Sequence, residues 1–165
     1  MPVLTPLEND WYSSQLSAAG EPSLWEASRH RAPGAGRTVR FTGLRSFHPP
    51  VVVRVDRLDS PRPRLSATEL TGRGGYAPGE PGKRVDRLLS AEEAAHLARV
   101  VDHSRALAEA PKECSLGCDG AQWLVEAADA GGHHLVMRWS PERGPVREVG
   151  LAMLALTGWT FGPVY

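Results

Sequence analysis

The sequence predicts an α+β fold: an antiparallel sheet of about six strands with N-terminal helices, one long crossing helix and a C-terminal helix. Three observations support this fold class. Short runs of alternating or β-branched residues follow one another through the middle of the chain. A capping box then opens a helical pattern, and glycines join two further apolar runs into a hairpin. Because the strands come in runs, an antiparallel sheet is favoured over a parallel one.

The N-terminal segment, Pro6 to His30, predicts two short helices separated by Ala19-Gly20-Glu21-Pro22. Turn-forming residues at 30–36 then separate these helices from the strands. We therefore expect one α+β domain over residues 1–165, with residues 1–36 as a helical extension packed on it. The side chains expected to contact the sheet are Leu7, Trp11 and Leu16 in the first helix, and Leu24 and Trp25 in the second.

Four strands are expected between residues 38 and 89. The first covers 38–44, where Gly43 shifts the alternation and predicts a bulge. The second, Val51 to Val55, is β-branched on both faces, which is typical of the middle of a sheet. The third and fourth cover 64–71 and 83–89. The stretch between them, 72–82, is too rich in glycine and proline for regular structure.

Two later helices have clear start signals. Ser90-Ala91-Glu92-Glu93 is a capping box, and the helix it opens is expected to run to about Leu107. Pro145 suits the first turn of a final helix, Val146 to Leu156, which ends before Gly158. The buried stripe expected on the crossing helix consists of Ala94, Leu97, Ala98 and Val101.

The hairpin between these helices allows an argument about register. A three-residue turn, Ala130-Gly131-Gly132, places Trp123 opposite Trp139 and makes one side of the hairpin wholly apolar. A two-residue turn would place Trp123 opposite Arg138 and mix the faces. We therefore expect the three-residue turn, with Glu126, His134 and Arg138 together on the other face.

Composition excludes several function classes. The 165 residues carry 19 basic and 19 acidic side chains, so the formal net charge is zero. A protein wrapped along nucleic acid needs a strong positive excess, and an anionic membrane surface attracts basic patches. The N-terminus has no basic segment followed by an apolar one, so we expect a cytoplasmic protein. In that compartment Cys114 and Cys118 would be thiols.

Several segments carry a family resemblance. Asp119 to Glu126 (DGAQWLVE), His134 and Arg138-Trp139-Ser140-Pro141 resemble, in this order, a family of small uncharacterised bacterial proteins with a DGAQW…E, YH and RWSP pattern. The segments 45–54 and 72–79 match an RSFHHPVVVR-like strand and a GAGGYEPG-like loop of the same family. The resemblance covers roughly residues 40–158 and departs from the pattern at Pro49, His133 and Cys118. That family has no activity to transfer, so the resemblance implies architecture alone.

The outer face of the hairpin holds the first candidate site. In the expected register Glu126 lies diagonal to His134 and Arg138, within side-chain reach. With Asp119 at the strand's entrance and His48 nearby, these groups could form an acid–base cluster. The alternatives are a rim that recognises a partner, or a solvated face with one ion pair.

Two other segments offer candidates. Cys114 and Cys118 with His133-His134 have ligands that zinc accepts, although their spacing differs from the usual C-x2-C. In the glycine-rich loop, Arg73 and Tyr76 are residue types favoured as anchors at interfaces. The alternative for that loop is a tyrosine folded back onto the sheet.

The leading hypothesis is a protein–protein interaction module, in its most concrete form an immunity or inhibitor protein that neutralises a bacterial toxin. Its partner would be another protein, such as a toxin domain, with no nucleic acid, membrane, cofactor or metal involved. The candidate contact residues are Arg73, Tyr76, Glu126, His134 and Arg138. One alternative is a small hydrolase-type enzyme that uses Glu126, His134 and Asp119, and a second is a small-ligand or metal-binding domain. An exposed Trp11 or Trp25 would favour an interface.

Overall fold

A computed structural model describes residues 3–114, 117 and 119–165. Its centre is a six-stranded sheet in the order β4-β3-β2-β1-β5-β6, with every neighbouring pair antiparallel. This confirms the predicted α+β fold class. The strands are β1 (Thr38–Arg45), β2 (Val51–Asp56), β3 (Arg64–Leu70), β4 (Pro81–Leu88), β5 (Ala121–Asp129) and β6 (Gly132–Trp139). The helices are α1 (Pro6–Ala18), α2 (Leu24–Arg29), α3 (Ala91–Ser104), the 3₁₀ helix η1 (Ala106–Ala108) and α4 (Pro145–Leu156).

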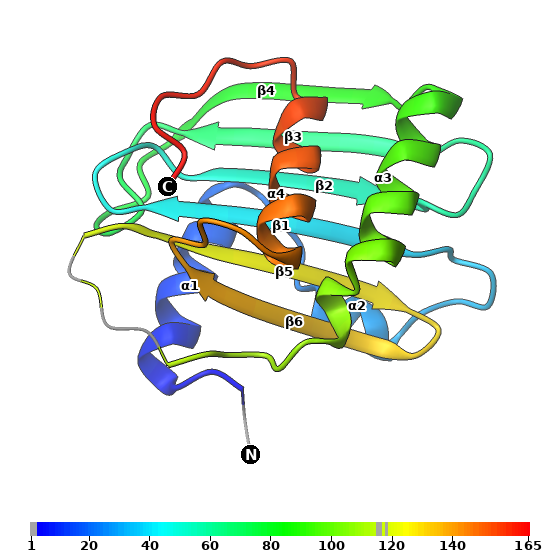
Figure 1. Cartoon of the computed structure of the whole chain (residues 1–165), viewed down its shortest axis with the longest axis horizontal. Coiled ribbons are helices and arrows are strands. Elements are labelled where there is room, and N and C mark those ends of the chain that lie inside the picture. The colour runs from blue at the N-terminus through cyan, green and yellow to red at the C-terminus, as the bar shows by residue number, and fades with distance from the viewer. Residues whose placement is uncertain (1–2, 115–116, 118) are drawn as a thin grey trace.

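Helices cover both faces of the sheet (Figure 1). Helices α3 and α4 pack on one face and α1 and α2 on the opposite one; these are called the α3–α4 face and the α1–α2 face below. Seven of the eight residues of β1 are buried, because side chains pointing either way meet a helix layer. The main apolar core lies on the α3–α4 face, where the C-terminal residues Trp159, Phe161, Val164 and Tyr165 also pack.

The N-terminal helices begin and end close to the expected residues, but they present different side chains to the sheet. Tyr12 and Gln15 are buried in α1, whereas Leu7 is 80% exposed. In α2, Leu24 is buried and Trp25 is 52% exposed. The prediction that Leu7 and Trp25 contact the sheet was therefore wrong. In each of these helices, apolar side chains lie on two faces that differ by one residue position. The spacing of the apolar residues therefore does not decide which of the two faces packs on the sheet.

The hairpin register was also predicted wrongly. β5 and β6 are joined by a two-residue turn, so Trp123 lies opposite Arg138 and Gln122 opposite Trp139. The amide of Gly131 donates to Oδ1 of Asp129 at 2.7 Å, which helps to close this turn. The three-residue turn would be favoured if one face of the hairpin were in solvent. Helices cover both faces of the sheet, so mixing polar and apolar residues carries no penalty where the polar groups find partners.

The remaining strand predictions differ in one feature. β1 pairs in unbroken register with β5 through Gly43 and Leu44, so the predicted bulge at Gly43 is wrong. Leu44 simply points to the α1–α2 face, where it packs against Tyr12. The register shift in this sheet lies instead between Thr68 and Leu70, where β3 pairs with β4.

The crossing helix α3 starts at the predicted capping box. The amide of Glu93 donates to Oγ of Ser90 at 3.1 Å, and the amide of Ser90 donates to Oε2 of Glu93 at 2.8 Å. The helix ends at Ser104, earlier than expected, because Arg105 adopts a left-handed conformation with φ of 57°. Of the predicted stripe, Ala94, Leu97 and Val101 are buried and Ala98 is half-buried. Within the described residues, every helix is too short or too polar to cross a bilayer.

Candidate functional site

A row of charged side chains crosses the α1–α2 face of the sheet. Arg54 on β2, Arg40 on β1 and Glu126 on β5 are successive cross-strand partners. Glu21, in the turn between α1 and α2, enters between the two arginines: its Oε2 accepts from Nε of Arg54 at 2.9 Å and from Nη1 of Arg40 at 3.4 Å. Asp56 extends the row beyond Arg54. Opposite charges therefore alternate along it, which ties the α1–α2 turn to the sheet.

Glu126 is held by two neighbours. Its Oε2 accepts from Nε and Nη2 of Arg40 at 2.8 and 2.7 Å, and its Oε1 lies 3.1 Å from Nε2 of His133. Burial raises the pKa of the Glu126 carboxyl, but the charge of Arg40 and the hydrogen bonds from His133 and Arg40 outweigh burial and lower it below its ordinary value. Glu126 is therefore a carboxylate at neutral pH, suited to orienting His133 rather than to donating a proton.

Two adjoining hollows lie over this row. The first, which we call the inner cleft, has a volume of about 460 Å³ and lies between the sheet and helices α1 and α2. Its lining includes Glu21, Arg40, Glu126 and His133. The second, which we call the edge groove, has a volume of about 880 Å³ and continues from the inner cleft to the free edge of β6. The two share Leu4, Asn9, Ser23, Trp25, His133 and Leu135.

The edge groove has mainly apolar walls. On one side lie the start of α1 and of α2, and on the other the segment 107–111, which begins within η1. Figure 1 shows that segment running alongside β6. Trp25, 52% exposed, lies at the groove with Cζ of Arg29 4.8 Å from its ring centroid. The apolar lining of the edge groove consists of Val3, Leu4, Pro6, Trp25, Leu107, Pro111 and Leu135.

The observed register separates the residues predicted to form an acid–base cluster. Glu126 faces α1 and α2, whereas His134 pairs with Ala127 and Arg138 with Trp123, whose side chains belong to the core on the α3–α4 face. His134 lies 3.6 Å from Asp129. Arg138 is buried and pairs with Glu109 at 2.8 Å and Glu113 at 3.3 Å. The structure does not bring Glu126 together with His134 or Arg138.

Asp119 and His48 belong to a different end of the sheet. Asp119 precedes β5, about 23 Å along the strand from Glu126 at roughly 3.3 Å per residue. Nδ1 of His48 lies 2.9 Å from the hydroxyl of Tyr165. The histidine that does meet Glu126 is His133, which our sequence argument considered only as a zinc ligand. Its signal was the two-residue turn alone, since that register pairs His133 with Ala128 on the face of Glu126.

The glycine-rich loop is docked rather than free. The indole N–H of Trp11 donates to the carbonyl of Gly74 at 3.0 Å, and the amide of Gly74 donates to the carbonyl of Arg45 at 3.0 Å. Tyr76, 63% exposed, lies against Phe47 with ring centroids 6.3 Å apart. Arg73 is exposed beside them. Phe47, Arg73 and Tyr76 form a second exposed surface, called the loop patch below, separate from the edge groove.

Cys114 and Cys118, the candidate zinc-ligating cysteines, lie in the segment before β5. Cys114 is an exposed thiol, and Cys118 lies outside the described residues. Among residues 3–114, 117 and 119–165, no group of three or more His, Cys, Asp or Glu side chains is placed to hold a metal ion.

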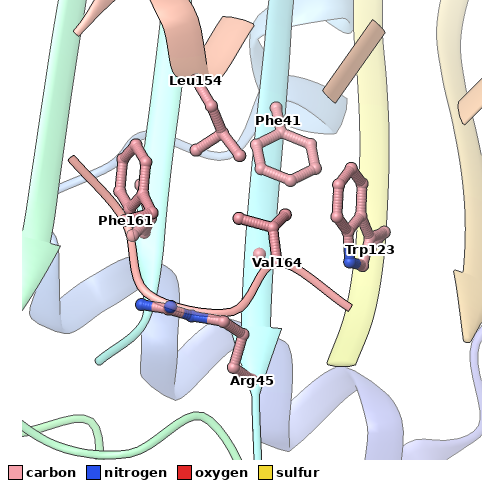
Figure 2. A pocket seen from close by; sticks show the side chains of 8 residues that line it. Phe41, Arg45, Trp123, Leu154, Phe161 and Val164 are labelled. Carbon is pink, nitrogen blue, oxygen red and sulfur yellow. The ribbon is translucent and has the colours of Figure 1, made fainter. Parts of the chain in front are cut away.

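A third hollow lies on the α3–α4 face beneath the C-terminal tail. Figure 2 shows Phe41, Trp123, Leu154, Phe161 and Val164 around it, with Arg45 at its rim. Its volume is about 20 Å³, the space of one water molecule. The indole N–H of Trp123 donates to the main-chain oxygen of Tyr165 at 2.9 Å, which holds the tail over the hollow. This hollow is a packing feature and too small for an organic ligand.

Comparison with protein-family models and with curated proteins finds no match for this chain.

Proposed function

We propose that this protein is a protein-binding module, of the kind that acts as an immunity or inhibitor protein against a bacterial toxin, and that it binds its partner at the edge groove. The observation that carries the proposal is the exposure of Trp25 at that groove. Tryptophan is among the residues that contribute most at interfaces, because a partner can cover its large apolar surface.

The surroundings of Trp25 support this reading. Val3, 43% exposed, and Leu4 extend the apolar surface around it, and Leu135 lies deeper in the groove. Glu126 already contacts neighbours through both carboxylate oxygens. Arg138 is buried and pairs with two glutamates, so neither side chain is available to contact a partner. His134, with 39% of its side chain exposed, lines the groove itself.

The experiment compares two variants in capture from native lysate of the source cells. Wild type is expected to retain one protein in stoichiometric amount, Trp25→Ala to lose it, and Tyr76→Ala, an aromatic deletion on the loop patch, to keep it. The captured protein is then assayed for toxicity with and without the wild-type chain. Loss of the partner by Tyr76→Ala alone would move the interface to the loop patch. Retention of no protein by wild type, or a captured protein without toxicity, would refute an immunity role.

An acid–base function is the second candidate, and one observation favours it. His133 lines both hollows, and its Nε2 is held by a carboxylate, an arrangement that orients the imidazole of a general base. The test is hydrolysis of p-nitrophenyl esters by wild type and by His133→Asn. Turnover that the substitution abolishes would support this function, and equal background rates in both proteins would refute it.

A further inference from the structure

We propose that the edge groove binds an extended segment of a partner protein, which adds as a strand to the free edge of β6 between Gly132 and Leu135 and places a basic side chain beside Glu109. This inference rests on the proposed function, because it specifies how the partner would be held.

The hydrogen-bonding pattern of β6 shows which main-chain groups are free. The amide of Met137 points away from β5, since it donates to the carbonyl of Pro111 at 2.8 Å. Main-chain groups alternate in direction along a strand, so those of Leu135 and His133 point the same way. Within the described residues, the outward N–H and C=O groups of these two have no hydrogen-bond partner. Two donors and two acceptors therefore lie in a row at the base of the groove.

The two edges of the sheet are protected differently. β4, at the opposite edge, carries Pro81, Lys83, Arg84 and Arg87, residues that discourage pairing with another strand. The stretch Gly132-His133-His134-Leu135-Val136 of β6 has no lysine, arginine or proline. Further along, Pro111 and Lys112 already pair beside Met137 as a parallel bridge. The edge of β6 thus pairs with another segment of this chain at Met137, and in the part of the chain that the structure describes it is free between Gly132 and Leu135.

The charges of the groove indicate the composition of the added segment. Among the described residues that line the groove, Glu109 is the only acidic one, and none is a lysine or arginine. Glu109 and Glu113 share Arg138 as their ion-pair partner, so Arg138 alone does not neutralise both carboxylates. An extended segment with apolar side chains at alternate positions and one lysine or arginine would match the walls, the edge and this charge.

A second copy of this chain fits less well. The groove walls, formed by the starts of α1 and α2 and by segment 107–111, stand on both sides of the edge. A single extended segment can enter between them, whereas another β6 would bring the same walls with it. The bridge at Met137 also blocks pairing along the whole strand.

The experiment uses a phage-displayed library of random dodecapeptides, selected on the wild-type protein and counter-selected on Leu135→Pro. Proline at position 135 removes an outward N–H and leaves the ladder to β5 in place. We expect enriched peptides with apolar residues at alternate positions and a basic residue. Glu109→Gln should remove the advantage of the peptide's basic residue over glutamine at that position.

Backbone-methylated peptides provide a readout that does not depend on the variant folding. N-methyl groups at alternate positions along one edge of an enriched peptide should weaken binding about tenfold or more, because each blocks a hydrogen bond to β6. Methyl groups along its other edge should change binding by less than about threefold. In NMR titrations the amide signals of His133 and Leu135 should move most.

Three outcomes would overturn the inference: no enrichment on wild type over Leu135→Pro, equal tolerance of methylation on both edges, or a wild-type dimer in light scattering that Leu135→Pro converts to monomer. The last result would assign the edge to a second copy. Capture of a toxic partner through Trp25 without strand-type peptides would leave the proposed function standing and refute strand addition. Enrichment of strand-type peptides without any captured protein would support strand addition and refute the proposed function.

Discussion

Arg40 on β1 and Glu126 on β5, 86 positions apart in the chain, form a two-donor ion pair in the interior, with Nε and Nη2 of the arginine 2.8 and 2.7 Å from one carboxylate oxygen. The arginine is 1% exposed and the glutamate 7%. Removing one member of such a buried pair is costly, because the charge of the other loses its closest partner while staying largely out of solvent.

Removal of one partner is therefore expected to destabilise the fold strongly. Glu126→Ala should lower the free energy of unfolding by about 3 kcal/mol, because Arg40 then keeps only its longer contact with Glu21 and the carbonyl of Pro22. Urea denaturation measures this loss. Asp86→Ala breaks the exposed pair of Asp86 with Arg64 and provides the control, for which a far smaller change is expected. Equal losses of unfolding free energy in both variants would show that the interior pair contributes no more to stability than the exposed pair.

The start of α3 should be sensitive to acid. Hydrogen bonds from Arg87 and from the amide of Ser90 lower the pKa of Glu93 from 4.5 to about 2. The stabilisation is present above the unfolded value of 4.5 and is lost as the pH falls through about 2. Because 32% of the side chain is exposed, solvent screening limits this contribution to about 1 kcal/mol. Unfolding measured between pH 5 and 2 should show a shallower acid loss in Glu93→Gln than in wild type.

Gly74 is expected to tolerate no side chain. A Cβ there would lie 2.6 Å from the carbonyl carbon of Leu44 and 2.7 Å from the amide of Arg45, both in the backbone. Gly74→Ala should therefore displace the loop, break its contact with Trp11 and lower stability by about 2 kcal/mol. Gly162→Ala is the control, because nothing lies within 4 Å of its Cβ position. Thermal unfolding distinguishes the two, and equal midpoints would contradict the close packing of the loop.

The tryptophans are expected to divide by role. Trp25→Ser should change the free energy of unfolding by less than about 1 kcal/mol, because half of the side chain is already in solvent. Trp123→Ala should cost at least about 3 kcal/mol, since Trp123 is 2% exposed and packs edge-on against Phe41. Denaturation of both variants checks this difference. A large loss for Trp25→Ser would mean that Trp25 serves packing rather than binding.

Local signals predicted the elements of this fold well. The capping box at Ser90 placed the start of α3, and the β-branched run at Val51 placed an interior strand. Proline at 145 marked the first residue of α4. Each of these features acts within one or two turns of chain, so the sequence around it contains the whole cause.

The site could not be predicted in the same way, because its contacts join distant residues. Arg40 reads as an outward polar residue of an alternating strand, and only the combined approach of Glu21 and Glu126 makes its burial stable. The choice between His133 and His134 depended on a turn differing by one residue. The alternation of apolar and polar residues determines the register of a hairpin when one face is exposed to solvent. Here both faces of the sheet are covered by helices.

The central position of β1 has a consequence for synthesis in the cell. Its partner on one side, β2, leaves the ribosome soon afterwards, but its partner on the other side, β5, begins at residue 121. Thr38, in β1, cannot pair with its partner Ala128 until β5 has been synthesised. Until then a nascent chain holds β4, β3, β2 and β1 with β1 at a bare edge, open to pairing with neighbouring nascent chains. A ribosome that pauses between residues 88 and 121 therefore leaves β1 without its second partner strand and its edge exposed to other chains.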